Sequence, residues 1–172
     1  AKVLATFVPS FPATPPEVVI MRTPSTDIPA LIVNESRPGR VVYLPAEIDR
    51  LYAEFNLADH GDLLANMVRW AAGDLLPLQV EGPGFLNVEL CRQGDRLILH
   101  LLNMSNPNAW RAPVTEITPA GPFRITLTQP AGMALSHAHS LVSKQSLPVS
   151  RRDKTLTFTV ATVGDHEVVV IS

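Results

Sequence analysis

The chain has a single cysteine, Cys91, and this is the one side chain that could act as a thiol nucleophile. A reactive thiolate needs a neighbouring base or a helix N-terminus, because the thiolate is the nucleophilic species. Cys91 instead lies in a predicted strand beside Arg92, so a structural or half-exposed strand cysteine is the better interpretation. One cysteine also excludes an internal disulfide and a thiolate-rich zinc site.

Two histidines, His137 and His139, have a spacing that could chelate a metal ion. On a strand both imidazoles would lie on one face, about 7 Å apart. A zinc site needs at least one further protein ligand, and no neighbouring Asp, Glu, Cys or His completes a recognisable motif. We therefore expect no metal site and no cofactor in this chain.

Acidic residues gather around two predicted helices, where they could supply the paired carboxylates of a glycosidase. They are Glu47, Asp49, Glu54, Asp59 and Asp62. All fall on the polar faces or at the caps of amphipathic helices, so a solvated helix face is the simpler interpretation. G-x-S-x-G and G-x-G-x-x-G motifs are absent from the sequence. We predict no catalytic residue in this chain.

Trp110 is the residue that we single out as a possible carbohydrate or partner contact. It lies in the polar loop 106–111, where an exposed indole could stack on a sugar ring or anchor a partner surface. The alternative is an indole that folds back over the end of a β-sandwich. Aromatic residues make up only 6% of the chain, which provides no larger sugar-binding platform.

The pattern of residues 1–76 predicts a partial α/β subdomain with about three strands and two helices. Apolar runs at 30–33 and 41–44 flank a Pro-Gly turn and predict adjacent strands. Because both runs are continuous rather than alternating, we expect these strands to be covered on both faces. Two amphipathic helices follow; the first has Pro45 in its first turn, and the second runs from an N-cap at Asp59 to Gly73.

Proline is unusually frequent, at 16 of 172 residues, and it is concentrated before this strand pair. Proline fixes φ and removes a donor, so this segment cannot be a helix or a central strand. Large apolar residues such as Phe7, Phe11 and Ile20 interleave with the prolines, which is atypical of a solvated linker. We predict an ordered, extended segment that lies across a neighbouring surface.

Residues 77–172 predict an antiparallel β-sandwich with one face of each sheet solvated. Short runs of apolar residues alternate with polar ones at 86–91, 123–128 and 156–161, and turns separate them. The fold class that we predict is therefore mixed α+β, with the partial α/β subdomain followed by the sandwich.

Charge, hydropathy and length exclude several function classes. The net charge is −2, which provides no basic footprint for nucleic acid or for an anionic membrane. No stretch approaches about 18 consecutive apolar residues, the minimum for a bilayer-spanning helix. At 172 residues the chain is also too short for a complete (β/α)₈ barrel, which needs about 250.

Several segments resemble, in order and spacing, a family of bacterial glycoside hydrolases. They are TDIPAL at 26–31, GRVVYLP at 39–45, DHGDLLAN at 59–66 and VRWAAG at 68–73. Together they resemble the later part of the beta-galactosidase trimerisation domain, a glutamine-amidotransferase-like, flavodoxin-like module. VEGPG at 80–84, PVTEI at 113–117 and DHEVVVI at 165–171 resemble the β-sandwich domain that follows this module.

The resemblance implies a non-catalytic C-terminal portion of a bacterial glycoside-hydrolase-like protein, with an oligomerisation or structural role. In such proteins the catalytic acids lie in an N-terminal barrel that this chain lacks, so the chain is not expected to be an enzyme. We expect self-association, or contact with the missing N-terminal part of the parent protein, in the bacterial cytoplasm. No nucleic-acid or membrane partner is expected. The alternative is a carbohydrate-binding β-sandwich that uses Trp110.

Overall fold

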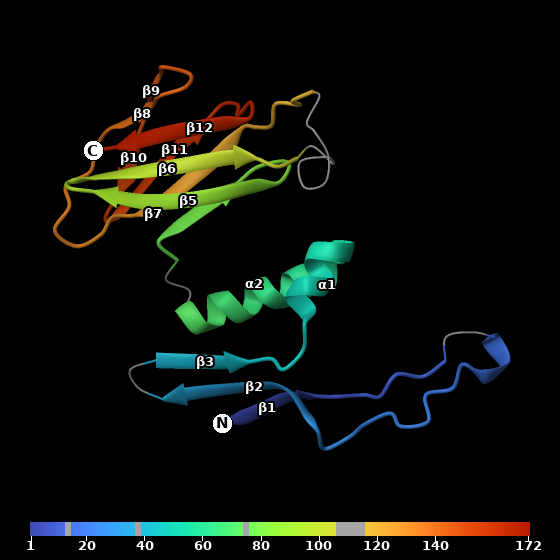
Figure 1. Cartoon of the computed structure of the whole chain (residues 1–172). Helices are drawn as coiled ribbons and strands as arrows, with labels where there is room; N and C mark the ends of the chain where they lie inside the picture. The colour runs from blue at the N-terminus through green and yellow to red at the C-terminus, as the bar shows by residue number, and fades with distance from the viewer. Residues whose placement is uncertain (13–14, 37–38, 74–75, 106–115) are drawn as a thin grey trace. The chain divides into compact units, whose positions relative to one another are not determined.

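The computed structural model describes residues 1–12, 15–36, 39–73, 76–105 and 116–172 (Figure 1). The chain divides into two compact units, Ala1–Leu75 and Leu76–Ser172, which we call unit 1 and unit 2. No helix in the described ranges is long and apolar enough to cross a membrane.

Unit 1 contains a three-stranded sheet and two helices, as predicted. Its strands β1 (Lys2–Thr6), β2 (Pro29–Ser36) and β3 (Gly39–Tyr43) pair in the order β1-β2-β3, and its helices are α1 (Ile48–Phe55) and α2 (Ala58–Ala72). Both strand pairs are antiparallel. Flavodoxin-like sheets are parallel, so the flavodoxin-like part of the prediction is not confirmed.

Both helices lie on one side of the unit 1 sheet (Figure 1). On β3, the side chain of Arg40 reaches α2, where its Nη1 donates to the carbonyl oxygen of Trp70 at 3.0 Å. Side chains alternate along a strand, so Arg40 and Val42 face the helices, while Val41 and Tyr43 face the other way. The prediction of strands covered on both faces is therefore wrong for the described part of unit 1, because both helices cover the same face.

The sequence predicts the C-terminal end of α2 correctly, but it does not predict the residues at which α1 and α2 begin. Gly73 ends α2 in the left-handed conformation, with φ of 66°, which glycine adopts without steric cost. The other end differs, because Leu57 is the N-cap of α2 and Asp59 lies in the first turn. A carboxylate there still favours the positive end of the helix dipole. Helix α1 begins at Ile48, after the N-cap Glu47, rather than near Pro45.

Residues 7–28, which we call the arm, connect β1 to β2. The backbone N–H of Phe7 donates to the carbonyl oxygen of Ile28 at 2.8 Å, and the Thr26 hydroxyl donates to the Phe7 carbonyl oxygen. Beyond this closed base the arm leaves the end of the sheet (Figure 1). Apart from the short 3₁₀ helix η1 (Pro16–Val18), its described residues form no regular element.

Unit 2 consists of two antiparallel sheets that enclose a common core. One sheet has the order β10-β11-β7-β4 and the other has the order β5-β6-β12-β8-β9. The strands are β4 (Leu78–Glu81), β5 (Leu86–Gln93), β6 (Arg96–Asn103), β7 (Phe123–Thr128), β8 (Ala138–Ser140), β9 (Ser146–Leu147), β10 (Ser150–Arg152), β11 (Thr155–Val160) and β12 (His166–Ile171).

The alternating strands predicted for unit 2 are confirmed. On β6, for example, Leu97, Leu99 and Leu101 are buried while the intervening residues point outward. The same alternation on β7, β11 and β12 fills the space between the sheets with apolar side chains. Strands β4, β8, β9 and β10 have only two to four residues each, too few for alternation to reveal them in the sequence.

Candidate functional site

Cys91 lies on β5 with its thiol free and exposed. Its cross-strand neighbour is Ile98 on β6. The hollow around it, of about 530 Å³, is lined among others by Arg92, Arg96 and His100. Cys91 lies on an edge strand, and the described part of unit 2 contains no helix whose N-terminus could activate the thiol. The strand environment agrees with the interpretation of an ordinary strand cysteine.

The histidines considered as metal ligands are not joined by further ligands. His139 lies on β8 and is exposed, while His137 precedes that strand and has its Nδ1 2.8 Å from the hydroxyl oxygen of Ser136. Among the described residues, no group of three or more His, Cys, Asp or Glu side chains could hold a metal ion.

A second histidine pair, which sequence reasoning missed, lies on the outer face of the five-stranded sheet. His100 on β6 and His166 on β12 stack with ring centroids 5.6 Å apart, and Nδ1 of His100 lies 3.4 Å from Nε2 of His166. Two nitrogens are too few for a protein zinc site. The residues are 66 positions apart, so only the strand register reveals their contact.

The acidic residues of the two helices face solvent, as predicted. All five are exposed. Two of them, Glu47 and Glu54, bind the guanidinium of Arg50 at 2.7 and 3.5 Å. A glycosidase pair would need two carboxylates facing each other across a cleft, with the acid partly desolvated. These five exposed carboxylates, two of them bound to Arg50, do not have that arrangement.

One carboxylate in unit 2, Glu167 on β12, is buried, with 2% of its surface exposed. Its oxygens accept backbone N–H groups from Val142 at 2.9 Å, Ser143 at 3.0 Å and Val168 at 2.8 Å. Burial by itself would raise the pKa of Glu167, but these N–H groups, together with the nearby Ser140 hydroxyl, favour the charged carboxylate, outweigh burial and lower the pKa. Glu167 therefore stays ionised and holds the loop after β8, which is a structural role.

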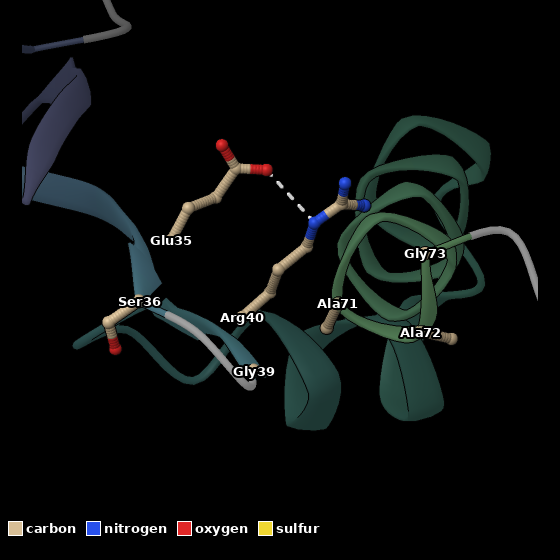
Figure 2. A pocket seen from close by; sticks show the side chains of 7 residues that line it. All are labelled: Glu35, Ser36, Gly39, Arg40, Ala71, Ala72 and Gly73. Atoms are coloured by element: carbon tan, nitrogen blue, oxygen red, sulfur yellow. Dashed lines mark ion pairs between the residues drawn. The ribbon is translucent and has the colours of Figure 1, made fainter.

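A pocket of unit 1, of about 580 Å³, lies between the β2–β3 hairpin and the end of α2. Figure 2 shows the Arg40 side chain crossing it, with Nε 2.9 Å from Oε1 of Glu35. The guanidinium also lies over the Trp70 ring, 5.3 Å from its centroid. Its charge is thus already paired, so the pocket is better explained as a structural link than as a ligand site.

Trp110, the contact residue predicted from the sequence, lies outside the described residues. Its role in carbohydrate or partner binding stays a prediction. Trp70, the other tryptophan, is half-buried on α2 under Arg40.

The feature of unit 1 that most needs a functional explanation is its exposed apolar surface. None of its described residues is buried. Among the residues that the structure describes, five large apolar residues are exposed in unit 2 and fourteen in unit 1. These are Val3, Leu4, Phe7, Phe11, Val18, Val19, Ile20, Met21, Ile28, Val41, Tyr43, Phe55, Leu57 and Val68.

Part of this surface is the sheet face opposite the helices, which we call the bare sheet face. Strand register places Val3, Ile32 and Tyr43 side by side across all three strands. Val41 lies on the same face, and its side chain and that of Tyr43 are both 58% exposed. A flat face of this composition can bind another apolar surface without first expelling charged groups.

Comparison with known proteins gives a structural similarity but no match in sequence. No protein-family model matches the chain, and no curated protein matches it significantly. The chain is similar in structure to alpha-L-fucosidase isoenzyme 2 from Paenibacillus thiaminolyticus, with a TM-score of 0.68 and 19% identity. The match covers 90% of this chain and 24% of that one, so the chain spans about a quarter of the fucosidase's length.

A second similar structure is a cycloisomaltooligosaccharide glucanotransferase from Paenibacillus sp., complexed with cycloisomaltoheptaose. That match has a TM-score of 0.40 and 17% identity and covers 59% of this chain and 19% of that one, which is too weak to support an inference. The fold of this chain is therefore one that also occurs in part of a glycoside hydrolase, the bacterial alpha-L-fucosidase.

Proposed function

We propose that this chain is a non-catalytic C-terminal portion of a bacterial glycoside-hydrolase-like protein, and that unit 1 serves in self-association. The observation that carries the proposal is the exposed apolar surface of unit 1, which has fourteen large apolar residues and no buried residue among those described. Unit 1 would then correspond to the later part of a beta-galactosidase trimerisation domain, and unit 2 to the β-sandwich that follows it.

An exposed surface of this kind is costly in water. Soluble monomers rarely expose contiguous apolar patches larger than a few hundred Å², and larger ones mark interfaces. Strand β1 is also an edge strand, with its second edge unpaired among the described strands, and such edges readily pair with another chain. Association would cover both the apolar side chains and the edge.

The surroundings of the carboxylates support the non-catalytic part of the proposal. The acids on α1 and α2 are exposed, and Glu47 and Glu54 are bound to Arg50. Glu167 is buried, but its lowered pKa keeps it ionised, whereas a general acid for glycoside cleavage needs a raised pKa. These carboxylates serve as solvated surface or as a loop anchor.

Light scattering and sedimentation velocity across a range of concentrations test the proposal. We expect particles whose mass is a multiple of the 18.7 kDa chain, with dissociation on dilution. Val41→Lys should shift the particles toward the monomer, because it places a charge on the bare sheet face. Val142→Lys in unit 2 is the matched control, since Val142 is 56% exposed against 58% for Val41. A monomer at every concentration would contradict the proposal.

A further inference from the structure

We propose that copies of this chain exchange arms, so that the arm of one copy lies on the bare sheet face of a second copy. This inference rests on the proposed self-association and adds which two surfaces meet. The occupant of the bare sheet face is thus residues 7–28 of another copy.

The arm has the composition of a segment that binds a surface. Seven of its described side chains are large, apolar and between 39% and 62% exposed. They are Phe7, Phe11, Val18, Val19, Ile20, Met21 and Ile28. The prolines among them restrict the backbone before binding, so docking loses less conformational entropy than it would for a flexible loop.

The base of the arm directs it away from its own sheet. The hydrogen bond from Phe7 to Ile28 and that from Thr26 to Phe7 hold the two ends of the arm together where the sheet ends. From there the arm projects beyond the sheet (Figure 1) and leaves the bare sheet face of its own unit uncovered. A second copy can supply the missing contact without any change in this base.

The receiving face matches the arm in chemistry. Val3, Ile32 and Tyr43 form a continuous row across β1, β2 and β3, and Val41 lies one row further along. The cross-strand neighbour of Val41 is the uncharged Asn34. No charge has to be desolvated at these positions when apolar side chains settle on them.

The available area favours an exchange in which each copy both donates an arm and accepts one. Side chains of this size have about 150–250 Å² of surface when fully exposed, so the half-exposed arm offers roughly 600 Å² and the bare sheet face roughly 300 Å². Neither surface alone reaches the ~800 Å² per partner of a standard interface. Because two surfaces in contact bury similar areas, each arm can bury roughly 300 Å² on the face that it meets. A copy that both donates an arm and accepts one therefore buries roughly 600 Å², which reaches the lower limit of a specific interface.

A photo-cross-linking experiment on the full chain tests the contact. Benzoylphenylalanine replaces Phe11 in the arm, and the variant is mixed with ¹⁵N-labelled wild-type chain before illumination. We expect mixed-isotope cross-links to the tryptic peptide 41–50, at Val41 or Tyr43. Benzoylphenylalanine at Phe55 on α1 is the control, because Phe55 is the same residue type and is 58% exposed; it should not label Val41 or Tyr43.

The outcomes separate this inference from the proposed function. Cross-links between copies that fall on the helices or on unit 2, in a sample that scatters as an oligomer, would overturn arm exchange and leave self-association standing. Cross-links confined to one copy, in a sample that sediments as a monomer, would overturn both.

Substituting apolar residues of the arm and measuring the dissociation constant of the oligomer provides a second, independent test. The double substitution Phe11→Ser and Ile20→Ser should raise the dissociation constant of the oligomer by at least about tenfold, because apolar contacts at an interface centre commonly contribute this much. Val68→Ser on α2, which is 61% exposed, should leave it unchanged. Circular dichroism establishes that each variant is folded, and an unchanged dissociation constant in the folded arm variant would overturn the inference.

Discussion

Unit 1 and unit 2 use apolar residues in opposite ways. In the described part of unit 2, fifteen apolar residues are buried, and they come from both sheets and from the loops between strands. In unit 1, no described residue is buried, although β2 and the arm are rich in valine, isoleucine and phenylalanine. Unit 2 therefore contains its own hydrophobic core, whereas unit 1 presents apolar surface that a partner can cover.

The difference begins with the strand patterns. Strand β6 alternates buried and outward residues, so one layer of opposing strands is enough to cover it. Strand β2 has apolar residues at successive positions, Leu31, Ile32 and Val33, all half-buried. Such a strand needs cover on both faces, and α1 and α2 supply it on one. The second layer has to come from outside the described part of unit 1.

The largest expected contrast between the units is in core truncation. Leu99→Ala should lower the free energy of unfolding of unit 2 by about 3–4 kcal/mol, because it opens a cavity at a fully buried position. Leu31→Ala in unit 1 should cost about 1 kcal/mol, since Leu31 is only half-buried. Urea unfolding with hydrogen exchange read by mass spectrometry assigns each loss to its unit, and equal losses would break the comparison.

The next effect concerns a polar anchor of unit 2. Asn103, at the end of β6, donates through Nδ2 to the carbonyl oxygens of Thr118 and Gly164, each at 2.8 Å, and its Oδ1 accepts the N–H of Ser105. Asn103→Ala should lower the free energy of unfolding by about 2 kcal/mol. Asn87→Ala on β5, where the side chain is exposed, should change it by less than about 0.5 kcal/mol in the same urea titration.

A smaller effect depends on pH. The folded-state pKa of Glu167 lies below its ordinary value of 4.5, so this carboxylate stabilises unit 2 fully above that value. Its contribution is lost as the pH falls through the lowered pKa. Glu167→Gln should lower the free energy of unfolding of unit 2 by roughly 1–2 kcal/mol at pH 7. It should also flatten the acid limb, which is the fall in unit 2 stability as the pH is lowered. Glu89→Gln, at an exposed position, should leave that limb unchanged in thermal melts from pH 3 to pH 7, a range that spans the ordinary carboxylate pKa.

The smallest effect is expected for the ion pair of unit 1. Arg40 is 38% exposed and Glu35 is 61% exposed, and exposed pairs contribute about 0.2–1 kcal/mol. Arg40→Ala should therefore cost less than about 1 kcal/mol while changing the Trp70 fluorescence, because the guanidinium leaves the ring. Arg69→Ala removes an equal charge from α2 as a control. A loss as large as that for Leu99→Ala would mean that unit 1 has a tightly coupled polar core.

Several parts of the molecule could be predicted from local sequence, and others could not. Gly73 was found because the end of a helix favours a residue that tolerates positive φ, and the alternating strands were found because the period is a property of neighbouring residues. The stack of His100 on His166 and the burial of Glu167 could not be found in this way. Both depend on pairings between strands that are far apart in the chain.

The sequence by itself determined where the two helices and the longer strands form, because hydrophobic period, proline and glycine act over a few residues. It also indicated that a thiol nucleophile, a metal site and a glycosidase carboxylate pair are poorly supported, since each needs partner side chains at spacings that the sequence does not show. The tertiary structure decided which apolar strands are covered. Which face of the unit 1 sheet is covered depends on where α1 and α2 pack. They leave the bare sheet face exposed, with Val3, Ile32, Val41 and Tyr43 on it. Burial is a property of the whole arrangement, so the surface proposed for association became visible only in three dimensions.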